Sequence, residues 1–462
     1  MRNTELFRST GRAPLRRALL GLLALLYLAH GTAVAAAPPT IQEYTLDNGL
    51  KLIVRPDHRA PVVVSQVWYK VGSSYEHPGI TGISHVLEHM MFQGTENYAP
   101  GEMSRIVSRA GGRENAFTSR DYTGYYQMWA ADRLPLSFEL EAERMRKLVL
   151  SKEEFEREVQ VVMEERRLRT EDNPIALGME RFNFVAYPAS PYRMPVIGWW
   201  EDLRAMTVAD LQAWYDRYYA PNNAVVVVVG DVEPTDVLAL AEKHFGPLQA
   251  EPPPPAKPPV ALDAIGERRL ELQLPAEVPF LAIGYEVPSL ATTDEPWKAY
   301  ALEVLAGVLS GGESALLPSE LVRGREMAAS VSASYSLATR LDSQFIFAGY
   351  PAQGHNLDEL ETALTDMVAR LQESLVEPER LERVKTQIVA DHLYQMDSVY
   401  YQAMQIGILE TTGIGWQMLE NYEQAIQQVS AEQLREVARH YLQPARRTVM
   451  HLNPLTQRGA EQ

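Results

Sequence analysis

One pattern of residues occurs twice in this chain, and this repeat limits the possible folds more than any other feature. A predicted helix, a proline turn and a buried strand at 207–232 are repeated at 429–454. The matching residues stand at one constant offset: Leu211, Tyr218 and Pro221 in the first copy, and Leu434, Tyr441 and Pro444 in the second. Self-similarity of this kind is typical of a duplicated structural unit. We therefore predict two copies of one fold.

A proline-rich segment separates the two copies. Residues 247–262 read PLQAEPPPPAKPPVAL, a composition that forms stiff, extended linkers. A chain of 462 residues is also longer than one ordinary hydrophobic core supports. The predicted organisation is a first domain at 38–246, a linker at 247–262 and a second domain at 263–462.

The first 37 residues have the features of an export signal. Arg12, Arg16 and Arg17 are followed by a short apolar stretch at 18–29 and a small-residue cleavage site at 33–35. The apolar stretch is too short to cross a bilayer comfortably; the alternative is an uncleaved anchor. We predict a signal peptide at 1–37, export to the periplasm, and no stable membrane span after cleavage.

Composition excludes several kinds of chemistry. Because the chain has no Cys, it has neither thiolate metal ligands nor a thiol nucleophile. The net charge is −17 and no basic block is present, which argues against nucleic acid as a partner. This acidity is compatible with basic peptide substrates and equally with a role in solubility alone.

A metal-binding pattern lies at 82–94, which reads GISHVLEHMMFQG. On a helix, His85 and His89 are one turn apart and face the same way, so that two imidazoles can bind one Zn²⁺. Glu88 stands beside them and can accept a proton from a water molecule at the metal. This is the inverted H-x-x-E-H form of a zinc-protease motif. The alternative, two surface histidines on an amphipathic helix, is disfavoured by the apolar residues around them.

A third ligand is available on the predicted helix at 152–171. Its apolar stripe consists of Phe155, Val159, Val162 and Met163. Glu165 and Glu158 fall together on one flank of this stripe, whereas Glu164 points further toward solvent. We predict Glu165 as the metal ligand and Glu158 as its neighbour, which supports the site. The alternative is that all three are solvated charges.

Two predicted strands, at 113–119 and 122–130, lie between the motif and this helix. An edge strand near the metal could pair with an extended peptide through its backbone, and Asn115, Ala116 and Phe117 are the candidate contacts. An ordinary internal strand pair is an equally good interpretation of the pattern.

The second copy carries no metal ligands at the equivalent place. The stretch 301–312 (ALEVLAGVLSGG) resembles the motif helix, but Ala306 and Gly307 stand where Glu88 and His89 stand in the first copy. We therefore expect the second half to form substrate-binding surface.

Four stretches together resemble the M16 (pitrilysin-like) metallopeptidases: HVLEHMMFQGT, NAFTS, VVMEERR and YYAPNNAVVVVVGDV. The resemblance is closest to short bacterial members related to the mitochondrial processing peptidase. It implies one zinc ion per chain held by His85, His89 and Glu165, with Glu88 as the base. It also implies an α+β fold of two homologous α/β domains. Each would be an antiparallel-rich sheet packed by helices, and the two would form half of a clam-shell chamber.

The sequence departs from the family at one substrate-contacting pair. Active members often carry an Arg and a Tyr in the second domain, and here Leu316 and Ala329 occupy those places. We therefore expect a dimer, in which a second M16-like subunit supplies the pair.

The predicted function is a zinc-dependent endopeptidase that cleaves peptides or small unfolded polypeptides. One alternative is an assembly or binding subunit of a heteromeric M16 complex with little activity alone. Another is a metal-dependent hydrolase of a different bond, which the peptide-pairing strand disfavours.

The export signal can be tested on the purified protein. We expect the mature chain to begin near residues 35–37, because the small residues there suit signal peptidase. Intact-mass measurement after expression in a secreting host gives the mature N-terminus, and a chain that still begins with Met1 would contradict the prediction.

Overall fold

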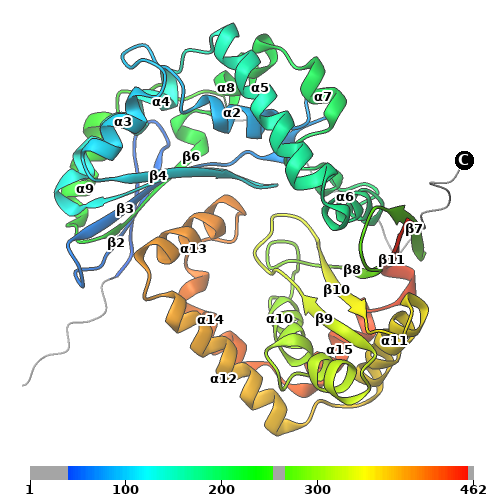
Figure 1. Cartoon of the computed structure of the whole chain (residues 1–462). Coiled ribbons are helices and arrows are strands. Elements are labelled where there is room, and N and C mark those ends of the chain that lie inside the picture. Colours follow the sequence, from blue (N-terminus) through cyan, green and yellow to red (C-terminus); the bar gives the residue numbers. More distant parts are fainter. Residues whose placement is uncertain (1–39, 253–265, 456–462) are drawn as a thin grey trace, which may run out of the picture. The chain divides into compact units, whose positions relative to one another are not determined.

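The computed structural model describes residues 40–252 and 266–455. The predicted signal peptide at 1–37 and most of the predicted linker at 247–262 lie outside these ranges. Within them the chain forms two mixed sheets with helices packed against each, which confirms the predicted α+β class (Figure 1). No helix of the described residues has both the length and the apolarity needed to cross a bilayer.

The first sheet has six strands in the order β1-β2-β6-β3-β5-β4. In that order the strands span Gln42–Thr45, Lys51–Pro56, Ala224–Gly230, Val62–Tyr69, Thr123–Ala130 and Arg113–Thr118. β2 and β6 are parallel, and all other neighbours are antiparallel. β6 is fully buried and almost entirely Val, as expected of a strand that is covered on both faces.

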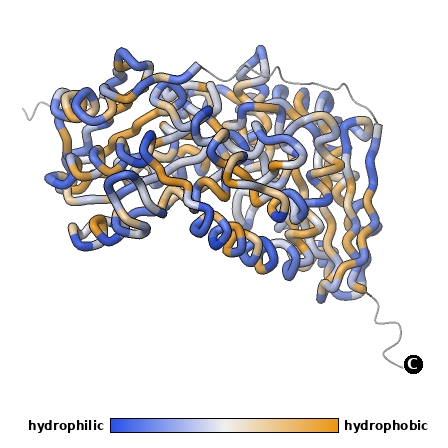
Figure 2. Tube along the Cα trace, turned by 90° about the horizontal axis from the view of Figure 1, so that it is seen from above, coloured by the Kyte–Doolittle hydropathy of each residue, from blue (hydrophilic) through white to orange (hydrophobic). Residues whose placement is uncertain are grey.

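The helices of the first half follow one another from α2 to α9. They span Ile83–Met90 (α2), Glu102–Arg109 (α3), Leu134–Arg146 (α4), Lys152–Arg166 (α5), Pro174–Ala186 (α6), Trp200–Ala205 (α7), Val208–Tyr218 (α8) and Pro234–His244 (α9). A π-helical turn, Arg167–Glu171, extends α5. In Figure 2, orange and blue residues alternate around the helices, as they do where one face is buried and the other is solvated.

The second sheet repeats the topology of the first. Its order is β7-β11-β8-β10-β9, and its strands in that order are Arg268–Leu274, Arg447–Pro454, Phe280–Val287, Ser343–Pro351 and Ala328–Ser334. It matches the first sheet from β2 to β4 and has no counterpart of β1; its one parallel pair, β7 and β11, corresponds to β2 and β6. The same order and the same strand directions confirm the repeat that the sequence predicts.

The second half supplies helices α10 to α15. They span Trp297–Ser310 (α10), Leu357–Glu373 (α11), Pro378–Gln395 (α12), Val399–Thr411 (α13), Met418–Gln428 (α14) and Ala431–Tyr441 (α15). Each half has a large core between its sheet and its own helices.

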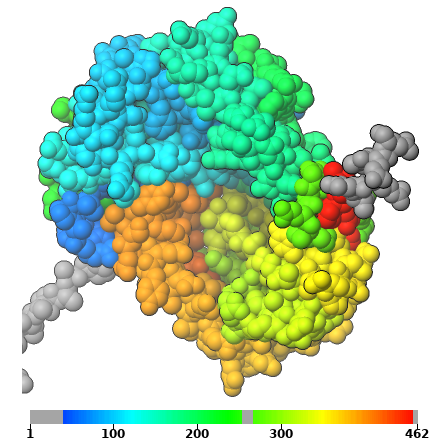
Figure 3. Space-filling model, viewed as in Figure 1, coloured from blue at the N-terminus to red at the C-terminus, as the bar shows by residue number. Residues whose placement is uncertain are grey.

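The opposite face of each sheet is covered by a helix from the other half. α13 packs on β3 and β6 of the first sheet, and α6 packs on β11, β7 and β8 of the second. Figure 3 shows residues around α13, in orange, in contact with first-half residues in blue and cyan. The sequence pattern alone did not predict this reciprocal exchange.

Polar side chains also join the two halves. Arg340 donates through Nε to Asp121 Oδ1 at 3.2 Å and through Nη2 to Ser74 Oγ at 2.7 Å. Lys51 pairs with Glu410 at 2.9 Å at a second point. These polar contacts add to the exchange of α6 and α13. Each half therefore needs a helix of the other half to cover the second face of its sheet.

The close approach of α13 to the first sheet depends on Gly407. A Cβ atom at this position would lie 2.0 Å from Cε2 of the buried Trp68 ring. We expect Gly407→Ala to lower the free energy of unfolding by about 1–3 kcal/mol, because the tightly packed ring cannot move freely. Urea unfolding monitored by Trp fluorescence measures this change. Ala favours a helix over Gly by about 1 kcal/mol, so an increase in stability would show that the contact is not tight.

Candidate metal and peptide site

The helix α2 is held in place by burial and by a carboxylate at its N-terminus. All of its residues except His89 are buried. The side chain of Glu76 accepts hydrogen bonds from the backbone N–H groups of Gly82, at 2.7 Å, and Ser84, at 3.0 Å. Burial raises the pKa of this Glu76 carboxyl to about 7. Gly82 has φ +87°, and a side chain there would meet the Ile197 carbonyl, so glycine suits this start of the helix.

The side chains of His85, His89 and Glu165 converge between α2 and α5. Glu165 Oε1 lies 3.8 Å from His85 Nε2, and Glu165 Oε2 lies 3.5 Å from His89 Nε2. The two imidazole rings are 4.9 Å apart and nearly perpendicular. Tetrahedral zinc with bonds near 2.0–2.1 Å separates its ligand atoms by about 3.3 Å. The observed spacing and the nitrogen–oxygen donor set therefore fit one such cation.

The protonation states of the site suit a metal ligand and a base. Burial, with a smaller contribution from His89, lowers the pKa of His85 to about 3 and keeps this ring neutral. Burial also raises the pKa of Glu88, although a hydrogen bond from Thr118 opposes this shift. The Thr118 hydroxyl donates to Glu88 Oε2 at 2.5 Å and fixes the carboxylate beside the histidines.

Glu158 and Glu164 lie on opposite sides of α5. Glu158 is buried, and its Oε2 lies 3.3 Å from His89 Nδ1 while Gln93 donates to its Oε1 at 3.0 Å. Glu164 is exposed and pairs with Arg167. The structure thus places Glu158 and Glu165 toward α2 and Glu164 toward solvent.

A cavity of about 660 Å³ opens over these groups. Asn115, Ala116 and Phe117 of β4 line it, together with His85, Glu88, His89 and Glu165. β4 is an edge strand, since it pairs only with β5. No strand of the described residues pairs with its other side, where an extended peptide could add; the Ala116 N–H at present donates to Asn115 Oδ1 at 2.9 Å.

Several cavity residues were not predicted from the sequence. Arg169, which pairs with Glu165 at 2.5 Å, lies one turn beyond it on the same helix. Thr118 belongs to the NAFTS stretch. The sequence predicted its neighbours as peptide contacts but did not predict the contact of Thr118 with Glu88. Arg120 and residues 192–197 also line the cavity, and no sequence pattern signals them because only the fold brings them there. All of the described lining residues lie between His85 and Ile197, so neither Leu316 nor Ala329 is among them.

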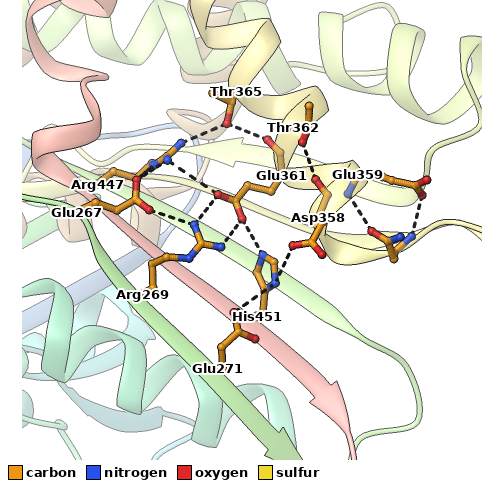
Figure 4. Close-up of polar contacts among 11 residues, drawn as sticks. Glu267, Arg269, Glu271, Asp358, Glu359, Glu361, Thr362, Thr365, Arg447 and His451 are labelled. Atoms are coloured by element: carbon orange, nitrogen blue, oxygen red, sulfur yellow. Dashed lines mark hydrogen bonds and ion pairs between the residues drawn. The ribbon is translucent and has the colours of Figure 1, made fainter.

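A second group of possible metal ligands, Asp358, Glu361 and His451, lies on α11 and β11 (Figure 4). Glu361 accepts from both terminal nitrogens of Arg269, at 2.8 Å each, and lies 2.8 Å from His451 Nε2. Although burial raises it, these hydrogen bonds lower the pKa of Glu361 to about 2. Asp358 is exposed, and each Glu361 oxygen accepts from a different nitrogen of Arg269, so we assign this cluster to holding α11 against the second sheet.

Sequence and structure comparisons place the chain among known proteins. Residues 51–183 match the family model "Insulinase (Peptidase family M16)", and residues 205–388 match "Peptidase M16 inactive domain". The chain is 33% identical to Zinc protease PqqE of Helicobacter pylori, over 94% of this chain and 98% of that protein. The chain belongs to peptidase family M16.

Other M16 relatives agree with this assignment. The chain is 27% identical to the uncharacterized zinc protease YmxG of Bacillus subtilis, over 78% of this chain and 85% of YmxG. The crystal structure of a protease from Helicobacter pylori superposes with a TM-score of 0.84 at 32% identity, covering 90% of this chain and all of that one. The periplasmic protease PqqL of Escherichia coli shares the fold, with a TM-score of 0.76 at 20% identity over 91% of this chain. This chain covers 48% of PqqL.

The contact between Glu158 and His89 predicts an effect on metal binding. A carboxylate beside a ligand histidine orients the ring and makes it more basic, and its loss typically weakens binding by about 10–100-fold. We expect Glu158→Gln to lower zinc affinity by this factor in competition titrations with a chromophoric chelator. Glu164→Gln, one residue from Glu165 but exposed, is the matched control and should bind zinc like the unaltered protein. Equal affinities in both variants would contradict the role of Glu158.

Proposed function

We propose that this M16 protein is a zinc-dependent endopeptidase that hydrolyses peptides or small unfolded polypeptides. The observation that carries the proposal is the convergence of His85, His89 and Glu165 beside Glu88 in one cavity. A zinc ion bound by these three side chains would act as a Lewis acid toward a peptide carbonyl and lower the pKa of water. We propose one such ion per chain.

The residues around this ion have separate tasks. Glu88, whose pKa is raised by burial, accepts a proton from the attacking water and passes it to the leaving amine. Thr118 holds the Glu88 carboxylate in position through its hydroxyl. Neutral His85 keeps a lone pair for the metal, and Glu158 orients His89.

The peptide is held along β4. Asn115, Ala116 and Phe117 lie on this edge strand and line the cavity, so that an extended segment can add to the sheet by backbone hydrogen bonds. Pairing of this kind reads the backbone and favours unfolded segments over folded domains. A substrate without a peptide backbone could not pair with this strand, which disfavours hydrolysis of another kind of bond.

A second subunit of the same fold is the proposed partner. The cavity is lined only by first-half residues among those described, and Leu316 and Ala329 replace the Arg and Tyr that the family implies. PqqL is about twice as long as this chain, as expected if one polypeptide there contains two such units. The alternative is an assembly subunit with little activity alone. It is supported by the same replacement of the Arg and Tyr by Leu316 and Ala329. Export to the periplasm is part of the proposal.

The role of Glu88 has a direct test. We expect Glu88→Gln to retain zinc but to lower peptide cleavage by about 100-fold or more, because the amide cannot accept a proton. His85→Ala should lose both zinc and activity. Zinc content by atomic absorption and cleavage of an unstructured peptide mixture, with and without chelator, measure these effects. Unchanged turnover by Glu88→Gln would reject the mechanism, and full activity of the chain as a homodimer would remove the need for a different partner.

A further inference from the structure

Three arginines line the cavity above the zinc-ligand candidates: Arg120, Arg169 and Arg193. Arg169 is already paired with Glu165. Neither Arg120 nor Arg193 forms an ion pair with any residue that the structure describes. These two guanidinium groups therefore carry positive charge that nothing in the described chain neutralises.

Aromatic rings hold both groups in place. The Arg193 guanidinium stacks 4.1 Å from the centre of the Phe184 ring and donates through Nη1 to the Pro188 carbonyl at 3.1 Å. Its buried Nε has no acceptor. Arg120 lies over the ring of Tyr192, the residue before Arg193, at 5.2 Å. Stacking leaves the edge of a guanidinium free to donate, and this edge matches a carboxylate.

The carboxylates of the same cavity are already engaged. Both oxygens of Glu180 accept from Arg166, at 2.8 and 2.9 Å. Glu88 accepts from Thr118, and Glu165 belongs to the proposed metal site. The free ionic groups facing a substrate are thus cationic, although the whole chain carries a charge of −17. A basic substrate side chain would find no free acidic partner among the described lining residues.

Arg120 also lies close to the proposed line of the peptide. It follows Thr118, the last residue of β4, by two positions, and Thr118 touches Glu88. Since an extended chain advances about 3.3 Å per residue, a peptide on β4 can bring residues within about three positions of the scissile bond to Arg120. Arg193 lines the same cavity.

We propose that Arg120 and Arg193 form a subsite for a carboxylate of the substrate, and that this enzyme prefers peptides with Asp or Glu near the cleaved bond. The inference rests on the proposed peptidase function. A carboxylate held by two guanidinium groups would gain charge-assisted hydrogen bonds in a partly buried cavity, where they are stronger than in water.

Peptide cleavage by the zinc-loaded protein tests the preference. The peptides are made in pairs that differ only by Glu or Gln at one of the three positions on either side of the cleaved bond. Each pair is made with a free C-terminal carboxylate and with a C-terminal amide. We expect kcat/KM to be about tenfold or more higher for Glu than for Gln at one position, and the ratio to fall as salt is raised. If cleavage depended on a free C-terminal carboxylate and not on Glu against Gln, the subsite would bind the terminal carboxylate. That result would overturn the side-chain preference.

Variants then assign the preference to the two arginines. Arg120→Gln and Arg193→Gln should each bring the Glu-to-Gln ratio toward one, mainly by lowering kcat/KM for the Glu peptide. Arg193→Glu should reverse the preference in favour of Lys. Arg204→Gln is the matched control, because Arg204 also stacks on an aromatic ring, that of Trp200, but lies outside the cavity. Thermal unfolding of each variant shows whether the fold is intact.

A binding measurement separates this inference from the proposed function. In the Glu88→Gln background, fluorescence anisotropy of a labelled Glu peptide should show tighter binding than that of its Gln counterpart, and Arg193→Gln should remove the difference. Cleavage with no preference for Glu, and equal binding of both peptides, would overturn the subsite but leave the peptidase intact. Selective binding without any cleavage would overturn the peptidase but leave the carboxylate site.

Discussion

The packing of α2 against α5 is the contact on which the rest of the site depends. α2 is buried over nearly its whole length, so the direction of its two histidines is set by the core and not by solvent. α5 faces it with Glu158 and Glu165, which are one heptad apart and therefore lie on one side of the helix. The Glu76 carboxylate fixes the start of α2. A small rotation of either helix would separate the nitrogen and oxygen atoms that now lie within 3.8 Å.

The second half shows the same packing without the chemistry. α10 packs on α12 as α2 packs on α5. At the position of His89, Gly307 allows close contact, and a Cβ there would lie 2.8 Å from Val384. The second copy therefore has the same helix packing without the His and Glu residues that α2 carries. What the second half does contribute is α13, which covers the first sheet, and Arg340, which binds Asp121 near the cavity segment.

Charge has different meanings for the whole chain and for the cavity. The net charge of −17 describes the surface as a whole and bears on solubility and long-range attraction. Within the cavity each acidic side chain has a partner, whereas Arg120 and Arg193 are held by rings and have none of opposite charge among the described residues. Substrate choice depends on the groups that a peptide touches. The net charge of the chain would favour basic peptides, whereas the free arginines of the cavity favour acidic ones.

The sequence by itself determined the duplicated α+β fold and the helices that carry the histidines and Glu165. These features depend on local periodicity, turn residues and a repeat at constant offset, all of which are written along the chain. It also favoured Glu165 over Glu164, because helical geometry fixes which side chains share a face. In the structure Glu164 is exposed to solvent.

Only the tertiary structure decided which distant residues meet. The packing of α13 on the first sheet depends on close contact of Gly407 with Trp68, which are far apart in sequence. The bond from Thr118 to Glu88 and the place of Arg193 in the cavity depend in the same way on long-range packing. No local pattern encodes such contacts, because the free energy that selects them comes from burying surfaces contributed by several elements at once.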